Sequence, residues 1–175
     1  MSKYESPIYE VLEKHDHIEI RHYDAFATVK YTTSEDPYAQ AAFQTLFRYI
    51  QGDNQSSASI AMTVPVYQDF KEKGMTMSFV VPKKYLLGIP KPNHPDLHID
   101  HFLEGFYAAI TFSGSQNIAN LRQHQTELLL WLKQKHYSMT SDVIAAFYNA
   151  PFTLPFLKRN ELMVKIDYTP IEENK

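Results

Sequence analysis

The sequence has 175 residues, of which 44% are hydrophobic and 21% are charged, which is typical of one globular domain or of two small units sharing a core. A net charge of −3 argues against a nucleic-acid-binding surface, because such surfaces need clustered basic residues. The absence of cysteine excludes disulfides, thiolate catalysis and zinc–thiolate sites.

The beginning of the chain carries no pattern that predicts targeting or a membrane span. Its first ten residues, MSKYESPIYE, contain no apolar run. The longest apolar stretch, residues 128–132, is far too short to cross a bilayer. We therefore expect a cytoplasmic protein without a transmembrane segment.

Strand-like alternation dominates the next part of the chain. A first strand begins in residues 8–12, and the stretch IEIRHYDAFATVKY of residues 18–31 follows it. Alternation of period two is typical of a strand buried on one face. It places Ile18, Ile20 and His22 on the same face. Asp24 then lies where a bend between two strand arms is easiest.

A helix is predicted after this stretch. Asp36 fits the capping position and Pro37 the first helical position. Apolar residues then follow helical spacing up to Gly52, which ends the helix. This spacing directs Phe43 and Phe47 towards a sheet and leaves Arg48 one residue off the apolar stripe.

Strand-like segments follow the first helix. Residues 62–66, MTVPV, contain Pro65, which cannot donate to a strand ladder, so this strand is expected at a sheet edge or a bulge. An alternating strand follows in residues 75–81. Residues 82–95 then hold four of the ten prolines and form the natural connection to the rest of the chain.

The second half repeats this order. Residues 99–112, IDHFLEGFYAAITF, echo the stretch of residues 18–31, and Gly105 takes the place of Asp24. A helix over residues 118–136, the segment FTLPF of residues 152–156 and a strand in residues 162–166 follow. The repeat predicts two β-α-β-β units, at about residues 8–81 and 97–167. Neither unit has enough strands to close a core alone, so we expect one domain.

Four segments in order resemble the SOUL haem-binding protein family. They are YEV with EIRHYDAFATV, LFRYIQGDN with IAMTVPV, YAAITFSG, and YNAPFTLPFLKRNELMVKI, which together span about residues 9–166. The resemblance implies an α+β fold: a distorted antiparallel β-barrel of two β-α-β-β repeats with pseudo-two-fold symmetry and two flanking helices. It also implies a cytoplasmic, non-enzymatic protein that binds haem or another tetrapyrrole.

The resemblance also implies candidate site residues. His22 stands at the position where some members are thought to ligate haem iron, and Arg48 matches a basic position that would hold a propionate. Gln40 and Leu154 stand where further basic residues would help, so this chain departs from that pattern. The apolar slot that haem needs would be lined by residues of the first helix and of the second proline segment. They are Phe43, Phe47, Phe152 and Leu154, for which core packing is the structural alternative.

Two functions from different classes remain open at this stage. The first is a haem carrier or buffer that binds in an apolar groove. The second is a binding module for another apolar small molecule or for a protein partner, without physiological haem binding. No catalytic motif is present. Glu161 is the carboxylate of most interest, with a charge pair to Arg159 or Lys158 as its expected structural role.

Overall fold

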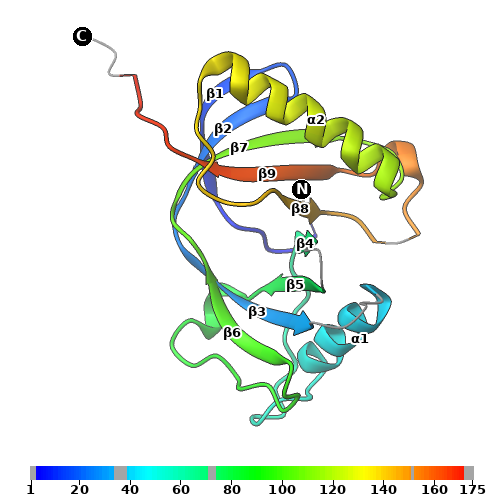
Figure 1. The fold of residues 1–175 in the computed structure, drawn as a ribbon. Helices are drawn as coiled ribbons and strands as arrows, with labels where there is room; N and C mark the ends of the chain where they lie inside the picture. Colours follow the sequence, from blue (N-terminus) through cyan, green and yellow to red (C-terminus); the bar gives the residue numbers. More distant parts are fainter. Residues whose placement is uncertain (1–2, 34–38, 71–73, 151, 172–175) are drawn as a thin grey trace.

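The computed structural model describes residues 3–33, 39–70, 74–150 and 152–171, which form two α-helices and nine strands (Figure 1). The strands are β1 (Tyr9–His15), β2 (Ile18–Tyr23), β3 (Phe26–Thr33), β4 (Val66–Phe70), β5 (Met75–Val80), β6 (Leu97–Phe102), β7 (Gly105–Phe112), β8 (Ile144–Phe147) and β9 (Asn160–Ile166). The helices are α1 (Ala39–Ile50) and α2 (Ile118–Lys135), and two short 3₁₀ turns are η1 (Lys83–Tyr85) and η2 (Pro155–Leu157).

The strands form a single antiparallel sheet in the order β1-β2-β7-β9-β8-β4-β5-β3-β6. The sheet curls into a half-barrel, with α2 over one half and α1 against the other (Figure 1). The pairing of β4 with β8 joins the two halves into one hydrogen-bonded surface. The predicted α+β class, with a distorted antiparallel barrel and two flanking helices, is confirmed.

The strand order is consistent with the predicted pseudo-two-fold repeat, and it adds an exchange of strands. One half reads β2-β7-β9-β8, and the other reads β6-β3-β5-β4. The strands β2 and β3 are consecutive in the chain but do not pair. Instead, β2 pairs with β7 and β3 pairs with β6, so each half borrows a strand from the other repeat. The expected bends lie between Tyr23 and Phe26 and at Gly105, whose φ of +151° favours glycine.

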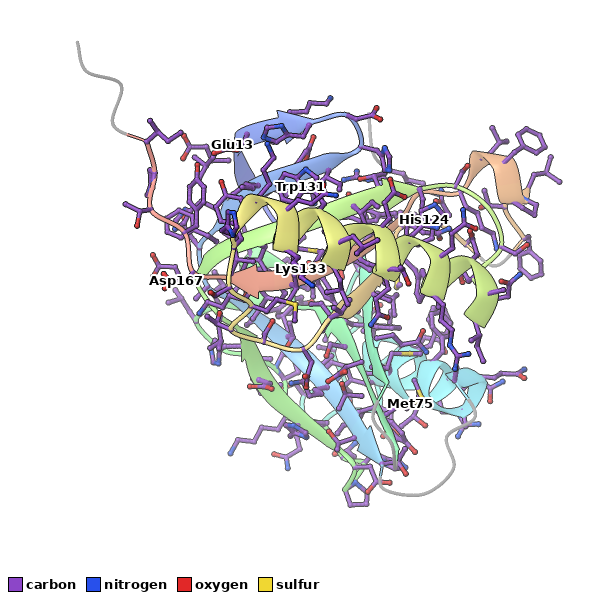
Figure 2. The ribbon with its side chains drawn as sticks, turned by 45° about the horizontal axis from the view of Figure 1, so that its top comes forward. Glu13, Met75, His124, Trp131, Lys133 and Asp167 are labelled. Atoms are coloured by element: carbon purple, nitrogen blue, oxygen red, sulfur yellow. The ribbon has the colours of Figure 1, made fainter. Side chains whose placement is uncertain are left out.

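Both helices cover the same face of the sheet. Leu128 and Leu132 of α2 are buried against apolar residues of β2, β7 and β9, such as Ile20. Leu46 of α1 is buried against β3 and β5, where Met75 lies. Figure 2 shows α2 crossing the strands of its half, with Met75 in the other half near α1. The apolar stripes that the sequence predicts are therefore the faces that dock the helices.

The opposite face of the sheet, which we call the inner face, is also buried, although no helix of the described residues covers it. Tyr23, Tyr67, Tyr107 and Met163 form a core on this face. A sheet face without a covering layer excludes water only where the sheet curls onto itself. The curl of the half-barrel therefore creates a second core, in which polar side chains are also found.

The helix boundaries follow the sequence closely. Asn117 caps α2, since its Oδ1 accepts a hydrogen bond from the Asn120 N–H at 2.8 Å. The helix ends at Lys135, and His136 follows in the left-handed conformation. The predicted cap of the first helix, Asp36 with Pro37, lies outside the described residues.

The two proline segments differ from the expectation. Pro65 lies just before β4, and β4 pairs on both sides, with β5 and β8, so it is not an edge strand. This is possible because a proline outside the ladder removes none of its hydrogen bonds. The second proline segment, FTLPF, forms no strand. Its Pro155 begins η2 in the connection between β8 and β9.

Candidate functional site

A buried ion network lies at the β2–β7–β9 half of the inner face. Glu161 is fully buried, and its carboxylate accepts hydrogen bonds from Arg21 Nη1 and Nη2, both at 2.8 Å. Arg159 Nη2 donates to the same carboxylate at 2.8 Å, and the Thr111 hydroxyl donates at 3.1 Å. Arg21 is 1% exposed and also donates from Nε to Glu19 at 2.8 Å. Two guanidinium groups are thus balanced by two carboxylates.

Tyrosine rings enclose this network. The Arg21 guanidinium lies 4.2 Å from the ring centroid of Tyr9, and the Arg159 guanidinium lies 4.0 Å from that of Tyr148. Tyr23 accepts a hydrogen bond from Arg21 Nη1 at 3.1 Å. Cation–π contacts strengthen when water is excluded, so the contact with Tyr9 stabilises the buried Arg21 cation more than the contact with Tyr148 stabilises Arg159, which is 42% exposed.

The electrostatics of Glu161 argue for a structural role. Burial alone would raise the pKa of Glu161, but the hydrogen bonds and charge of Arg21, with those of Arg159, hold that pKa below its usual value. A carboxylate that stays ionised and accepts several hydrogen bonds is a poor general acid or base near neutral pH. Arg159 is the pairing partner that the sequence predicts, and Arg21 is the one it misses.

A signal for Arg21 was present in the sequence. The alternation that puts Ile18 and Ile20 on the helix-covered face puts Arg21 and Tyr23 on the opposite face. An arginine in mid-strand with tyrosine two residues later indicates a polar group inside a second buried face. Its partner was not predictable by this means, because Glu161 lies 140 residues away in the chain.

His22 lies on β2, on the helix-covered face that the sequence predicts. Its side chain is 28% exposed, its ring centroid is 5.1 Å from that of Phe106, and its Nε2 is 3.6 Å from a carboxylate oxygen of Glu104. Asp24 and Glu104 can bring ligand atoms within 4.8 Å of one another and of the histidine. The imidazole is thus partly exposed beside one aromatic ring and one carboxylate.

The aromatic residues predicted on the first helix form a pair. The Phe43 and Phe47 rings are stacked at 5.9 Å with 13° between their planes, and Phe43 packs edge-on against Phe79 of β5. Phe79 is buried, whereas Phe47 is 38% exposed. Arg48 lies in the last turn of α1 and is exposed. The helix therefore presents an apolar ring with a cation next to it in the sequence.

Phe152 and Leu154 are exposed on the connection between β8 and β9. Phe152 is 96% exposed and Leu154 is 55% exposed, so neither is a core residue. Phe156 and Leu157, which the sequence analysis did not select, are 71% and 62% exposed on the same connection. Figure 1 shows this connection, in orange, on the same side of the molecule as α1.

The predicted site residues do not form one cluster. His22 is on β2, in the half covered by α2, whereas α1 packs on β3 and β5 of the other half. Five strand-to-strand steps separate β2 from β5 in the sheet order, each about 4.8 Å. His22 and the Phe43–Phe47 pair therefore lie in different halves of the sheet and make two separate candidate sites.

These features define a two-repeat α+β half-barrel with exposed aromatic surface. The family model described as "SOUL heme-binding protein" matches residues 4–165. The chain belongs to this SOUL heme-binding family, as the resemblance in the sequence predicts. Family membership supports haem as a possible ligand.

The chain is also similar to curated and solved proteins. Heme-binding protein 2 of Homo sapiens is 27% identical over 168 residues, covering 90% of this chain and 82% of that protein. The Mus musculus protein of the same name is 26% identical, with the same coverage. A solved structure described as a hydrolase from Listeria innocua has a TM-score of 0.62 at 12% identity, over 86% of this chain and 91% of that one. The EcmrR C-terminal domain has a TM-score of 0.63 at 11% identity, over 93% and 99%. These two structures share the fold alone.

Within the described part of the chain, none of the helices has the length and hydrophobicity needed to cross a membrane.

Proposed function

We propose that this protein is a non-enzymatic, cytoplasmic haem-binding protein that holds the tetrapyrrole by its macrocycle, on the exposed aromatic surface of α1. The observation that carries the proposal is the stacked Phe43–Phe47 pair, with Phe47 38% exposed and Arg48 next to it. A porphyrin is a flat apolar ring with two carboxylates. An accessible phenylalanine and a neighbouring guanidinium match those two parts.

The residues of α1 fit the ring and a propionate better than they fit the iron. The helix sequence AQAAFQTLFRYI contains no histidine, cysteine or methionine. The Tyr49 hydroxyl is engaged, since it donates to the Pro90 carbonyl at 2.7 Å. Bound haem would supply its usual redox-active iron, but the chain would hold it by apolar contact and charge. Iron-free porphyrin is therefore expected to bind about as well as haem.

In this proposal, Phe152 and Leu154 also supply apolar surface for contact with the macrocycle. Both are exposed, and the connection that carries them lies on the side of the molecule where α1 lies (Figure 1). Water-exposed apolar surface of this kind is more typical of an interaction site than of an ordinary connection. A macrocycle that covered part of it would gain about 25 cal/mol per Å² of apolar area removed from water.

The test is a titration with haemin and with protoporphyrin IX, followed by absorbance and by quenching of Trp131 fluorescence. Wild type is expected to bind both with affinities within about three-fold. Phe47→Ala should weaken both by about ten-fold, because it removes the accessible ring. Leu130→Ala is the matched control, since Leu130 is 55% exposed on α2, in the other half, and should change neither affinity. Failure of both ligands to saturate would overturn the proposal.

A second candidate is haem held by an iron–His22 bond. It is favoured by the partly exposed imidazole beside Phe106. In this case His22→Ala would abolish the Soret shift with haemin, and protoporphyrin would bind weakly or not at all. The proposal based on α1 expects His22→Ala to stay within two-fold of wild type, so one set of titrations separates the two sites.

A further inference from the structure

The connection between β8 and β9, residues 148–159, exposes a dense group of large apolar side chains. Four of them lie within six residues and are between 55% and 96% exposed: Phe152, Leu154, Phe156 and Leu157. Apolar residues on a surface are ordinarily scattered singly, whereas a contiguous group marks a site of interaction. The connection is not the rim of a small-molecule site on the inner face, since none of its described residues lines the cavity of about 280 Å³ that opens there between the two halves.

Backbone hydrogen bonds hold this exposed connection in shape. At its base, the Tyr148 N–H donates to the Arg159 carbonyl at 3.2 Å. At its middle, the Pro155 carbonyl accepts from the Gly114 N–H at 2.8 Å, which ties the connection to the turn before α2. Three further N–H groups donate to the carbonyl three residues earlier, those of Thr153, Leu157 and Lys158. An apolar medium can accept such a segment at low cost, because these backbone donors are already paired.

The charges around the connection are positive, although the whole chain has a net charge of −3. Residues 39–52, 113–126 and 143–160 contain no aspartate or glutamate. They include α1, the beginning of α2 and the connection itself, which lie on one side of the molecule in both views (Figures 1 and 2). Their lysines and arginines are Arg48, Arg122, Lys158 and Arg159. This side therefore combines exposed apolar residues with basic ones and suits an anionic partner.

The chemistry of the exposed residues favours a lipid surface over a protein partner. Residues 152–157, FTLPFL, contain no tyrosine, tryptophan or arginine, the residues that most often dominate binding between proteins. Phenylalanine and leucine side chains carry no polar atom, so they match acyl chains. Anionic headgroups above those chains would attract the basic residues nearby. The cytoplasmic leaflet of a membrane is anionic, which agrees with the cytoplasmic location proposed above.

We propose that the β8–β9 connection docks the protein reversibly on an anionic lipid bilayer, with Phe156 and Leu157 at the boundary of headgroups and acyl chains. Lys158, which follows them and is partly exposed, would contact the headgroups. The site goes beyond haem binding and does not rest on it. Phe152 and Leu154 are shared with the proposed haem surface, whereas Phe156 and Leu157 are not, so the experiment uses the second pair.

The experiment is flotation of the full-length protein, without haem, on vesicles of phosphatidylcholine alone or with about 30% phosphatidylserine. Wild type is expected to bind the anionic vesicles about ten-fold more tightly and to lose this difference at high salt. Phe156→Ala and Leu157→Ala should each weaken binding by about ten-fold, because each removes apolar area from contact with lipid. Leu130→Ala is the matched control, since Leu130 is 55% exposed on α2 and should change binding by less than about two-fold.

A second pair of variants tests the charge. Lys158→Ala should weaken binding to the anionic vesicles by about five-fold and leave the neutral ones unchanged, whereas Lys133→Ala, in the last turn of α2, should change neither. All these residues are at least partly exposed, so the variants should fold, and circular dichroism would verify this. Equal effects of Leu157→Ala and Leu130→Ala would overturn the proposal. Failure to float with either vesicle would also overturn it and would assign the connection to a protein partner. The haemin titration contains no lipid, so its failure and the failure of this site are distinguishable.

Discussion

Glu161→Ala is expected to lower the free energy of unfolding by about 3–5 kcal/mol, the typical cost of removing one partner from a buried ion pair. The reason is that Arg21, which is 1% exposed, would lose both of its 2.8 Å hydrogen bonds to the carboxylate and keep its charge inside the inner face. Chemical denaturation of wild type and variant measures the difference. Asp100→Asn is the control, because its pair with Lys30 is partly exposed and should contribute less than about 1 kcal/mol.

The double variant Arg21→Met with Glu161→Leu separates charge from packing. It replaces the pair with apolar side chains and leaves Arg159, which is 42% exposed, able to turn towards water. We expect it to be more stable than Glu161→Ala, because the two fully buried charges are removed together and the charges that lose a partner, Glu19 and Arg159, are partly exposed. A double variant that is less stable than Glu161→Ala would show that the network contributes more to the free energy of unfolding than the compensation of its own charges. A loss below about 1 kcal/mol in Glu161→Ala would contradict the structural role of the network.

The same carboxylate predicts how stability depends on pH. The pKa of Glu161 in the folded protein is below the ordinary value of 4.5, so the folded state binds this proton less readily than the unfolded state does. The contribution of Glu161 is therefore complete above pH 4.5 and is lost as pH falls through the folded pKa. Glu161→Gln should show a smaller loss of stability over this acidic range than wild type. An identical slope in both proteins would contradict the assignment.

Leu46→Ala and Leu128→Ala are each expected to cost about 2–5 kcal/mol, the range for removing a buried leucine from a packed core. Leu46 is fully buried between α1 and its half of the sheet, and Leu128 is fully buried between α2 and the other half. Because β4 pairs with β8, the sheet is continuous, and each variant should shift one common unfolding transition. Ile118→Ala, at a residue 67% exposed at the start of α2, is the control and should change stability by less than about 0.5 kcal/mol.

The measurement is thermal unfolding followed by far-ultraviolet circular dichroism and by the fluorescence of Trp131, which reports on the half that carries α2. Coincident transitions in all variants would support one domain built from the two repeats. A Leu46→Ala variant that melts in two steps, with the fluorescence transition unchanged, would mean that the halves unfold independently.

Several features of the fold were predictable from local pattern. Alternation placed Ile18, Ile20 and His22 on one face of β2, and helical spacing placed the boundaries of α2 within one residue. These features depend on the spacing at which apolar residues repeat along a strand or helix, and this spacing is a property of short segments. The similarity of the two halves likewise follows from comparing the sequence with itself.

The candidate site was only partly predictable. Phe43, Phe47 and Arg48 belong to one helix, so helical spacing alone brought them close together. The distance between His22 and this helix depends instead on the exchange of strands, which puts β2 in the half that α1 does not cover. Segment patterns carry no information about which strand of an antiparallel sheet pairs with which.

The sequence by itself determined the class of fold, the family and the placement of Phe43, Phe47 and Arg48 on one helix. Only the tertiary structure decided that Arg21 meets Glu161, that Tyr67 is buried without a partner, and that a cavity opens between the halves. The physical reason is that all three lie on the inner face, which is buried because the sheet curls and not because a helix covers it. Curl and long-range register are set by the packing of the whole chain, since no single strand specifies them.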